Sequence, residues 1–180
     1  MVVFRSGAYT LKTRPDIIET EKEFRDNMDL SQVNGVLFNV LALKNSSVLA
    51  EYDAMMWKEN QVWFVEYKDS VGAVKRMNAK RAQQVSDTSR NLARIFGFAE
   101  YNFTIVVNGL EEETIKGGAT VLPLRELNGF EPEYYSAYVE LDYINKLLEK
   151  YSRDDYQSEV SGEKVLSDLN KLKNMIEQNI

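Results

Sequence analysis

Three apolar runs follow one another between residues 36 and 68, separated by short polar segments, and they limit the fold more than any other feature of the chain. Each is rich in β-branched, aliphatic or aromatic residues and lacks proline, which is typical of β-strands. The four polar residues Lys58–Gln61 between the second and third runs predict a hairpin. The predicted strands are Val36–Leu43, Val48–Trp57 and Val62–Lys68.

Helices are predicted before and after these strands in the sequence. Pro15 suits the first turn of a helix, and apolar residues then recur near helical spacing, which predicts a helix from Pro15 to Leu30. The stretch from Lys75 to Phe96 has no Pro or Gly and predicts a second helix that ends at Gly97. Further strands are predicted at Phe103–Val107 and Thr120–Leu124. The resulting order is αβββαβ, an α/β (α+β) fold with a central mixed sheet flanked by helices.

The chain beyond Phe130 is predicted to be helical, with two apolar stripes on either side of a polar loop at Ser152–Gly162. Ser161 is the expected N-cap of the second of these helices. We expect residues 1–130 to form the core and residues 131–180 to form a helical extension packed on the same domain. The stripes suit core packing or a homodimer formed through the C-terminal helices. They consist of Leu141, Ile144, Leu148 and Tyr151, and of Val165, Leu169, Leu172 and Ile176.

The sequence contains neither cysteine nor histidine, and this restricts its chemistry. Thiol nucleophiles, His-dependent catalytic triads and His- or Cys-ligated zinc are excluded. Carboxylates, Lys, Tyr, Ser and Thr remain, and such groups favour hard cations with oxygen ligands. We expect a cytoplasmic protein without a membrane partner, because no apolar run has the length of a signal peptide or a spanning helix.

A symmetric hairpin turn predicts which charged residues of the two strands lie opposite one another. The register pairs Asp53 with Glu66 and Glu51 with Lys68, all on one face of the sheet. Facing carboxylates repel each other, and a divalent cation such as Mg²⁺ would compensate. The alternative is an ordinary Glu51–Lys68 ion pair on a solvated face. Because the run Val62–Val65 is apolar on both faces, we favour a covered sheet with a metal site at its rim.

Asp53, followed thirteen residues later by Glu66-Tyr67-Lys68 at the end of an apolar strand and then by a long helix, resembles the PD-(D/E)XK nuclease superfamily. The αβββαβ order is similar to the restriction-endonuclease-like core of that superfamily. Within it, the chain looks most like Holliday junction resolvases and nuclease-related domain proteins. The resemblance covers roughly Pro15 to Val107, and Tyr52 stands where the motif name has Pro.

The resemblance implies roles for individual residues. Asp53 and Glu66 would ligate Mg²⁺ or Mn²⁺ together with the main-chain carbonyl of Tyr67, and Lys68 would position or activate the attacking water. A further Glu on the first helix corresponds best to Glu21, with Glu23 and Glu19 as alternatives.

Some relatives also carry a Gln on the helix that follows the Lys. Gln83 or Gln84 corresponds to it, although neither is followed four residues later by the Tyr seen in those relatives.

Residues 68–94 carry seven basic and two acidic side chains, whereas the whole chain has a net charge of −6. Such asymmetry predicts a phosphate-binding face, although an ordinary solvated helix would have similar residues. The predicted contacts to nucleic acid are Lys75, Arg76, Lys80, Arg81 and Gln83. The expected function is that of a metal-dependent endonuclease, a hydrolase acting on DNA. A catalytically inactive nuclease-fold module that binds nucleic acid or a protein is the alternative.

Overall fold

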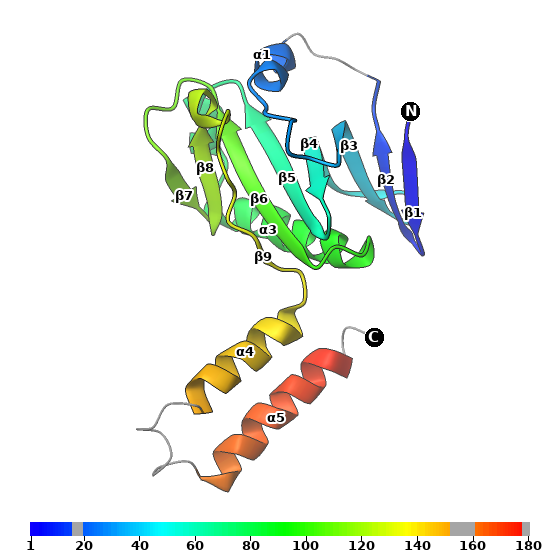
Figure 1. Ribbon diagram of the computed structural model, residues 1–180, viewed down its shortest axis with the longest axis vertical. Helices are drawn as coiled ribbons and strands as arrows, with labels where there is room; N and C mark the ends of the chain where they lie inside the picture. Colours follow the sequence, from blue (N-terminus) through cyan, green and yellow to red (C-terminus); the bar gives the residue numbers. More distant parts are fainter. Residues whose placement is uncertain (16–19, 152–160, 178–180) are drawn as a thin grey trace. The chain divides into compact units, whose positions relative to one another are not determined.

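The computed structural model describes residues 1–15, 20–151 and 161–177. The chain divides into two compact units, Met1–Ala137 and Tyr138–Ile180. The first unit is a mixed α/β structure with a central mixed sheet flanked by helices, which confirms the predicted fold class at this level (Figure 1). None of the described helices is both long enough and apolar enough to cross a membrane.

The described strands form one nine-stranded sheet in the order β1-β2-β3-β4-β5-β6-β8-β7, with β9 paired to β6. The neighbours β5, β6 and β8 are parallel, and all other pairs are antiparallel. The strands are β1 (Val3–Ser6), β2 (Tyr9–Thr13), β3 (Gly35–Lys44), β4 (Ser47–Lys58), β5 (Gln61–Lys68), β6 (Glu100–Val107), β7 (Thr114–Lys116), β8 (Ala119–Pro123) and β9 (Tyr135–Ser136).

The three strands predicted from the apolar runs are confirmed as β3, β4 and β5, within two residues at each end. The hairpin β1–β2 was missed, because its short strands alternate apolar with polar residues and lack a continuous apolar run. The turn between them offered a signal: Gly7 has a positive φ of 55°, as Ser-Gly turns commonly require.

The predicted first helix is shorter in the structure. Helix α1 spans Thr20–Asp26, so the predicted C-terminal end at Leu30 is wrong, and Ile17 and Ile18 lie outside the described residues. Asn27 ends the helix, with its side-chain amide donating to the carbonyl of Glu23. The seven residues of α1 are too few for a helix to persist without tertiary contacts.

The predicted second helix is two helices, α2 (Val71–Arg76) and α3 (Ala79–Ile95). The break falls at Asn78, whose side chain caps α3 by accepting a hydrogen bond from the main-chain N–H of Arg81 at 2.7 Å. Gly72 lies inside α2 rather than before a helix, which corrects the predicted start. The predicted stop is confirmed: Gly97 has a φ of 85°, and the N–H of Phe98 donates to the carbonyl of Ala93.

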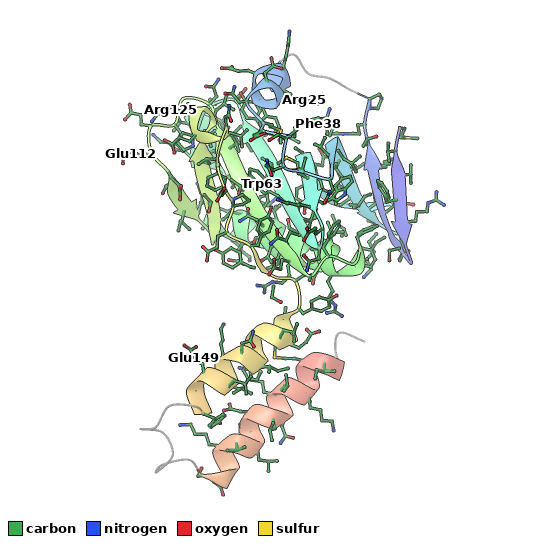
Figure 2. The ribbon with its side chains drawn as sticks, viewed as in Figure 1. Arg25, Phe38, Trp63, Glu112, Arg125 and Glu149 are labelled. Atoms are coloured by element: carbon green, nitrogen blue, oxygen red, sulfur yellow. The ribbon has the colours of Figure 1, made fainter. Side chains whose placement is uncertain are left out.

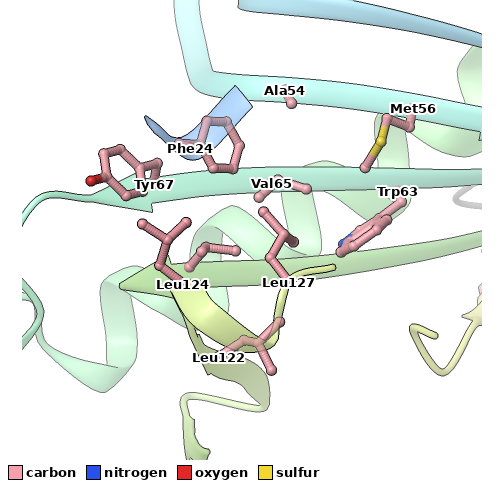
Figure 3. Packing of buried hydrophobic residues seen from close by; sticks show 10 residues of the cluster. Phe24, Ala54, Met56, Trp63, Val65, Tyr67, Leu122, Leu124 and Leu127 are labelled. Atoms are coloured by element: carbon pink, nitrogen blue, oxygen red, sulfur yellow. The ribbon is translucent and has the colours of Figure 1, made fainter. Parts of the chain in front are cut away.

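Helix α1 is held on the sheet by its aromatic and cationic side chains. Phe24 is fully buried, and its ring stacks on that of Tyr67 with centroids 5.1 Å apart. The guanidinium of Arg25 lies 4.5 Å from the centre of the Phe38 ring (Figure 2). Phe24 belongs to a core on this face of the sheet that also includes Trp63, Val65 and Tyr67 of β5 and residues of β4, β6 and β8 (Figure 3). Helix α3 crosses the other face (Figure 1).

The second unit contains α4 (Val139–Tyr151) and α5 (Gly162–Glu177), which pack against each other. The predicted N-cap is confirmed, because the Ser161 hydroxyl accepts from the N–H of Lys164 at 3.3 Å. Most of the predicted polar loop, residues 152–160, lies outside the described residues. Asp168 on α5 binds two residues of α4: Lys150 Nζ at 2.6 Å and the Tyr151 hydroxyl at 2.5 Å.

Candidate functional site

The β4–β5 hairpin has the predicted register over most of its length. Its pairs run from Lys58 and Gln61 to Ala54 and Val65, and there the recorded ladder ends. Val65 continues to pair with β6, so β5 remains in the sheet while β4 separates from it. The candidate site lies at this point of separation.

At Asp53, the side chains of strand β4 switch from one face of the sheet to the other. Tyr52 packs on the ring of Phe64, with centroids 4.7 Å apart, whereas Ala54 is buried in the α1-side core together with Val65. Phe64 and Val65 are adjacent on β5 and point to opposite faces. Tyr52 and Ala54 therefore also face opposite sides, although residues two apart on a regular strand share a face.

The irregularity extends to β3. Asn39 has a φ of 51°, and it lies opposite Asp53 between two registered pairs without forming such a pair itself. The left-handed backbone conformation of Asn39 in β3 and the reversed side-chain direction at Asp53 in β4 mark a distorted segment of the sheet. Such distortions are common beside functional sites.

The Asp53 carboxylate fills the space between the separating strands. Its Oδ2 accepts a hydrogen bond from the main-chain N–H of Tyr67 at 2.5 Å. The predicted arrangement, with Asp53 facing Glu66 as a ladder pair, is therefore corrected: Asp53 reaches across to the main chain of the following residue. A regular ladder would occupy that N–H, and its end at Ala54 frees the N–H for the side chain.

The surroundings of Asp53 disfavour its charged form. Burial raises the pKa of Asp53 to about 6, against the opposing effects of the Tyr67 N–H and the charge of Lys68. The charges of Glu21 and Glu66 raise this pKa further, so both carboxylates act on Asp53. A cation at this point would reverse the penalty for the charged form.

Glu66 and Lys68 form an ion pair with each other, with Nζ and Oε1 2.5 Å apart. They lie two residues apart on β5 and share the face opposite Val65 and Tyr67. The predicted pairing of Glu51 with Lys68 is wrong. Glu51 binds Arg14 instead, at 3.0 Å, because β4 has left β5 before this position and pairs there with β3.

Helix α1 brings one of the three candidate glutamates to the site. Glu21 is only 8% exposed, is bound by Arg25 at 2.9 Å, and acts electrostatically on Asp53. Glu23 is not among the charges that act on Asp53, and its carboxylate lies 3.5 Å from the side-chain nitrogen of Asn108. Glu19 lies outside the described residues.

Two features of the site were not predicted. The buried hydroxyl of Tyr52 lies 2.8 Å from Ser89 Oγ, which joins β4 to α3 next to Asp53. Beside the site, burial is the main cause that raises the pKa of Tyr67. The second feature is at the end of β5, where the main-chain N–H of Asn108 donates to the carbonyl of Lys68. Both links join residues far apart in the chain, and the Asn108-Gly109 turn was the only signal for the second.

The predicted nucleic-acid contacts fall into two groups. Lys75, Arg76, Lys80 and Arg81 are exposed on α2 and the first turn of α3, and within the described ranges none of them forms an ion pair. We call these four residues the basic patch. Gln83, also exposed on α3, differs in being bound within the protein: its side-chain amide donates to Asp87 at 3.0 Å and its oxygen lies near Gly118. Gln84 is exposed on the same helix.

Among the described residues, no three Asp, Glu, His or Cys side chains form a group that could hold a metal ion. The carboxylates that act on one another here are those of Asp53, Glu66 and Glu21, because the charges of the two glutamates both raise the pKa of Asp53. A cation held here would need water or phosphate oxygens to complete its coordination, which is the usual way in which proteins hold Mg²⁺. No protein-family model matches the chain, and comparison with curated proteins and with solved structures gives no significant match.

Proposed function

We propose that the protein is a metal-dependent nuclease of the PD-(D/E)XK type that hydrolyses phosphodiester bonds in DNA. The observation that carries this proposal is the approach of Asp53, Glu66 and Lys68 where β4 separates from β5, with Glu21 acting on Asp53 from α1. Residues from three separate elements of the chain supply the carboxylates and the amine that metal-assisted hydrolysis needs.

The order of elements supports the same assignment. Helix α1, strands β3, β4 and β5, the helical segment α2–α3, and strand β6 reproduce the αβββαβ order. Strand β6 then pairs in parallel with β5, and the helical segment between them supplies the crossover that parallel neighbours need. We propose that these elements form a restriction-endonuclease-like core, to which β1–β2 and β7–β9 are additions.

The chemistry of the residues fits a hard divalent cation. Asp53 is a partly buried carboxyl group whose charge is poorly stabilised, and Glu66 is a second carboxylate beside it. Mg²⁺ or Mn²⁺ would be held by Asp53, Glu66 and the main-chain carbonyl of Tyr67. Such an ion polarises a scissile phosphate and lowers the pKa of a bound water.

The remaining residues have roles that follow from their contacts. Lys68 now neutralises Glu66, and once a cation takes over that task its ammonium group is available to hold the attacking water or a phosphate oxygen. Arg25 holds Glu21 in place through an ion pair on one side of α1. The basic patch would bind the phosphate backbone, whose contacts supply affinity without sequence preference.

A cleavage assay tests the proposal. Labelled linear duplex, branched and single-stranded DNA are incubated with Mg²⁺, with Mn²⁺ or with chelator. We expect metal-dependent cleavage by the wild type, and losses of at least about 100-fold for Asp53→Ala and Lys68→Ala. Glu131→Gln is the matched control, because it removes an exposed carboxylate outside the site.

Equal cleavage by the wild type and both site variants would overturn the claim that Asp53 and Lys68 are catalytic. Absence of cleavage from the wild type on every substrate, combined with retained DNA binding, would support the non-catalytic module instead. A thermal shift gives a second measurement: Mn²⁺ should raise the melting temperature of the wild type but not of Asp53→Ala.

A further inference from the structure

Helix α3 directs one row of side chains toward the candidate site. Arg81, Val85 and Ser89 are spaced four residues apart and so lie along the same side of the helix. Val85 and Ser89 are buried, and Ser89 Oγ meets the hydroxyl of Tyr52 at 2.8 Å. The row therefore faces β4 beside Asp53, and Arg81 extends it to the start of the helix.

The start of α3 lies at the same edge of the sheet as the end of β5. Only ten residues, including α2, separate the end of β5 at Lys68 from the first residue of α3 at Ala79. Helix α3 leads back to β6, which pairs in parallel with β5, so its first turn lies at the edge of the sheet where β5 ends. Glu66, near the end of β5, and Arg81, in the first turn of α3, are therefore placed at the same edge.

Arg81 differs from Lys68 and Arg25 in being free to bind an anion. Lys68 is neutralised by Glu66, and Arg25 by Glu21. No ion pair of Arg81 is found with any described residue, and its side chain is exposed.

The main chain that carries Arg81 is held firmly in place. Its N–H donates to the capping side chain of Asn78 at 2.7 Å. On the neighbouring turn, Gly117 approaches so closely that a Cβ there would lie 2.1 Å from the carbonyl oxygen of Ala79. Because its main chain is already fixed, Arg81 has to order only its side chain in order to bind an anion.

We propose that Arg81 contacts the phosphate group being cleaved, and so serves the reaction itself rather than general affinity for DNA. This inference rests on the proposed nuclease function. A guanidinium can donate two parallel hydrogen bonds to two phosphate oxygens, which a Lys ammonium cannot reproduce. Such a contact gains strength as negative charge develops on those oxygens in the transition state.

The test separates rate from affinity. Single-turnover cleavage is measured at saturating DNA for the wild type, Arg81→Lys and Arg81→Ala, and DNA affinity is measured separately by fluorescence anisotropy in chelator. We expect Arg81→Lys to keep most of the affinity and to lose about 100-fold in the saturating rate, with a similar or greater loss for Arg81→Ala. Melting temperatures of both variants should match the wild type, because Arg81 is exposed.

Arg5 provides the matched control. It is an exposed arginine on β1, at the far edge of the sheet, and it also lacks an ion pair with any described residue. Arg5→Lys and Arg5→Ala should therefore cleave at the wild-type saturating rate.

Two failures can be told apart. If the wild type cleaves and depends on Asp53, but the Arg81 variants lose only affinity or nothing, this inference alone is overturned. If the wild type does not cleave, the proposed function fails and the role of Arg81 fails with it.

Discussion

The carboxylate of Asp53 accepts a hydrogen bond from the main-chain N–H of Tyr67, fourteen residues later in the chain, at 2.5 Å. This bond replaces a rung of the β4–β5 ladder at the point where the two strands part. It holds the candidate metal ligand against the strand that carries Glu66 and Lys68. Because Asp53 is also partly buried and lies near two other carboxylates, its protonation should be linked to the stability of the fold.

The first prediction concerns pH. Burial raises the pKa of Asp53 from 3.8 to about 6, so between these values the folded protein binds more protons than the unfolded chain. In chelator, the wild type should therefore lose stability relative to Asp53→Asn as the pH rises from about 4 to about 6. The difference should grow by up to about 3 kcal/mol, and by less to the extent that solvent screens the partly exposed group.

Urea unfolding of both proteins at several pH values measures this difference. A constant difference across the window would contradict the raised pKa. Addition of Mn²⁺ at pH 7 should recover part of the loss in the wild type only, since a bound cation favours the ionised carboxylate.

The second prediction concerns the bond between Tyr52 and Ser89. The Ser89 hydroxyl donates to the carbonyl of Val85, so its oxygen accepts the proton of the Tyr52 hydroxyl. Tyr52→Phe should lower the free energy of unfolding by about 1 kcal/mol. Ser89→Ala should cost more, about 1–3 kcal/mol, because it leaves a buried hydroxyl without its acceptor. Urea unfolding of the single and double variants tests this, and equal costs for the two single variants would contradict the assignment of donor and acceptor.

The third prediction concerns the attachment of α1. Phe24 is fully buried on Tyr67, so Phe24→Ala should destabilise the protein by about 3–5 kcal/mol. Cleavage should also fall at temperatures where the variant remains folded, because the short helix that carries Glu21 loses its main anchor. Phe4→Ala is the control, since Phe4 is 44% exposed and should cost less than about 1 kcal/mol. Thermal melts and cleavage rates measure both effects, and a folded Phe24→Ala with wild-type cleavage would contradict a role for α1 in the site.

The fourth prediction concerns the contact between Gly117 and the start of α3. Gly117 has a φ of 57°, and a Cβ there would lie 2.1 Å from the Ala79 carbonyl oxygen, so Gly117→Ala must displace main chain. Gly129→Ala meets no atom within 4 Å and bears only the strain of its φ of 82°. We expect about 1–2 kcal/mol for Gly129→Ala and a larger loss for Gly117→Ala, measured by urea unfolding. Equal losses would show that the close approach is relaxed in solution.

Much of the sheet could be predicted because its signals are local. The apolar runs indicated β3, β4 and β5, and the polar tetrad between the last two indicated the hairpin register that holds from Lys58 to Ala54. The break between α2 and α3 was harder to predict from the sequence. It depends on Asn78 acting as an N-cap, and the uniform helical propensity around it concealed that signal.

The sequence by itself determined which chemical groups are available, and that Glu66 and Lys68 share one face of a strand, because side-chain alternation follows from the main chain alone. Only the tertiary structure decided that Glu51 binds Arg14 rather than Lys68, that Glu21 rather than Glu23 approaches Asp53, and that Asp53 bonds to the main chain of Tyr67. Each of these depends on where β4 leaves β5 and on how α1 packs against Tyr67. Such contacts join residues far apart in the chain, and their geometry follows from packing of the whole core rather than from any local pattern.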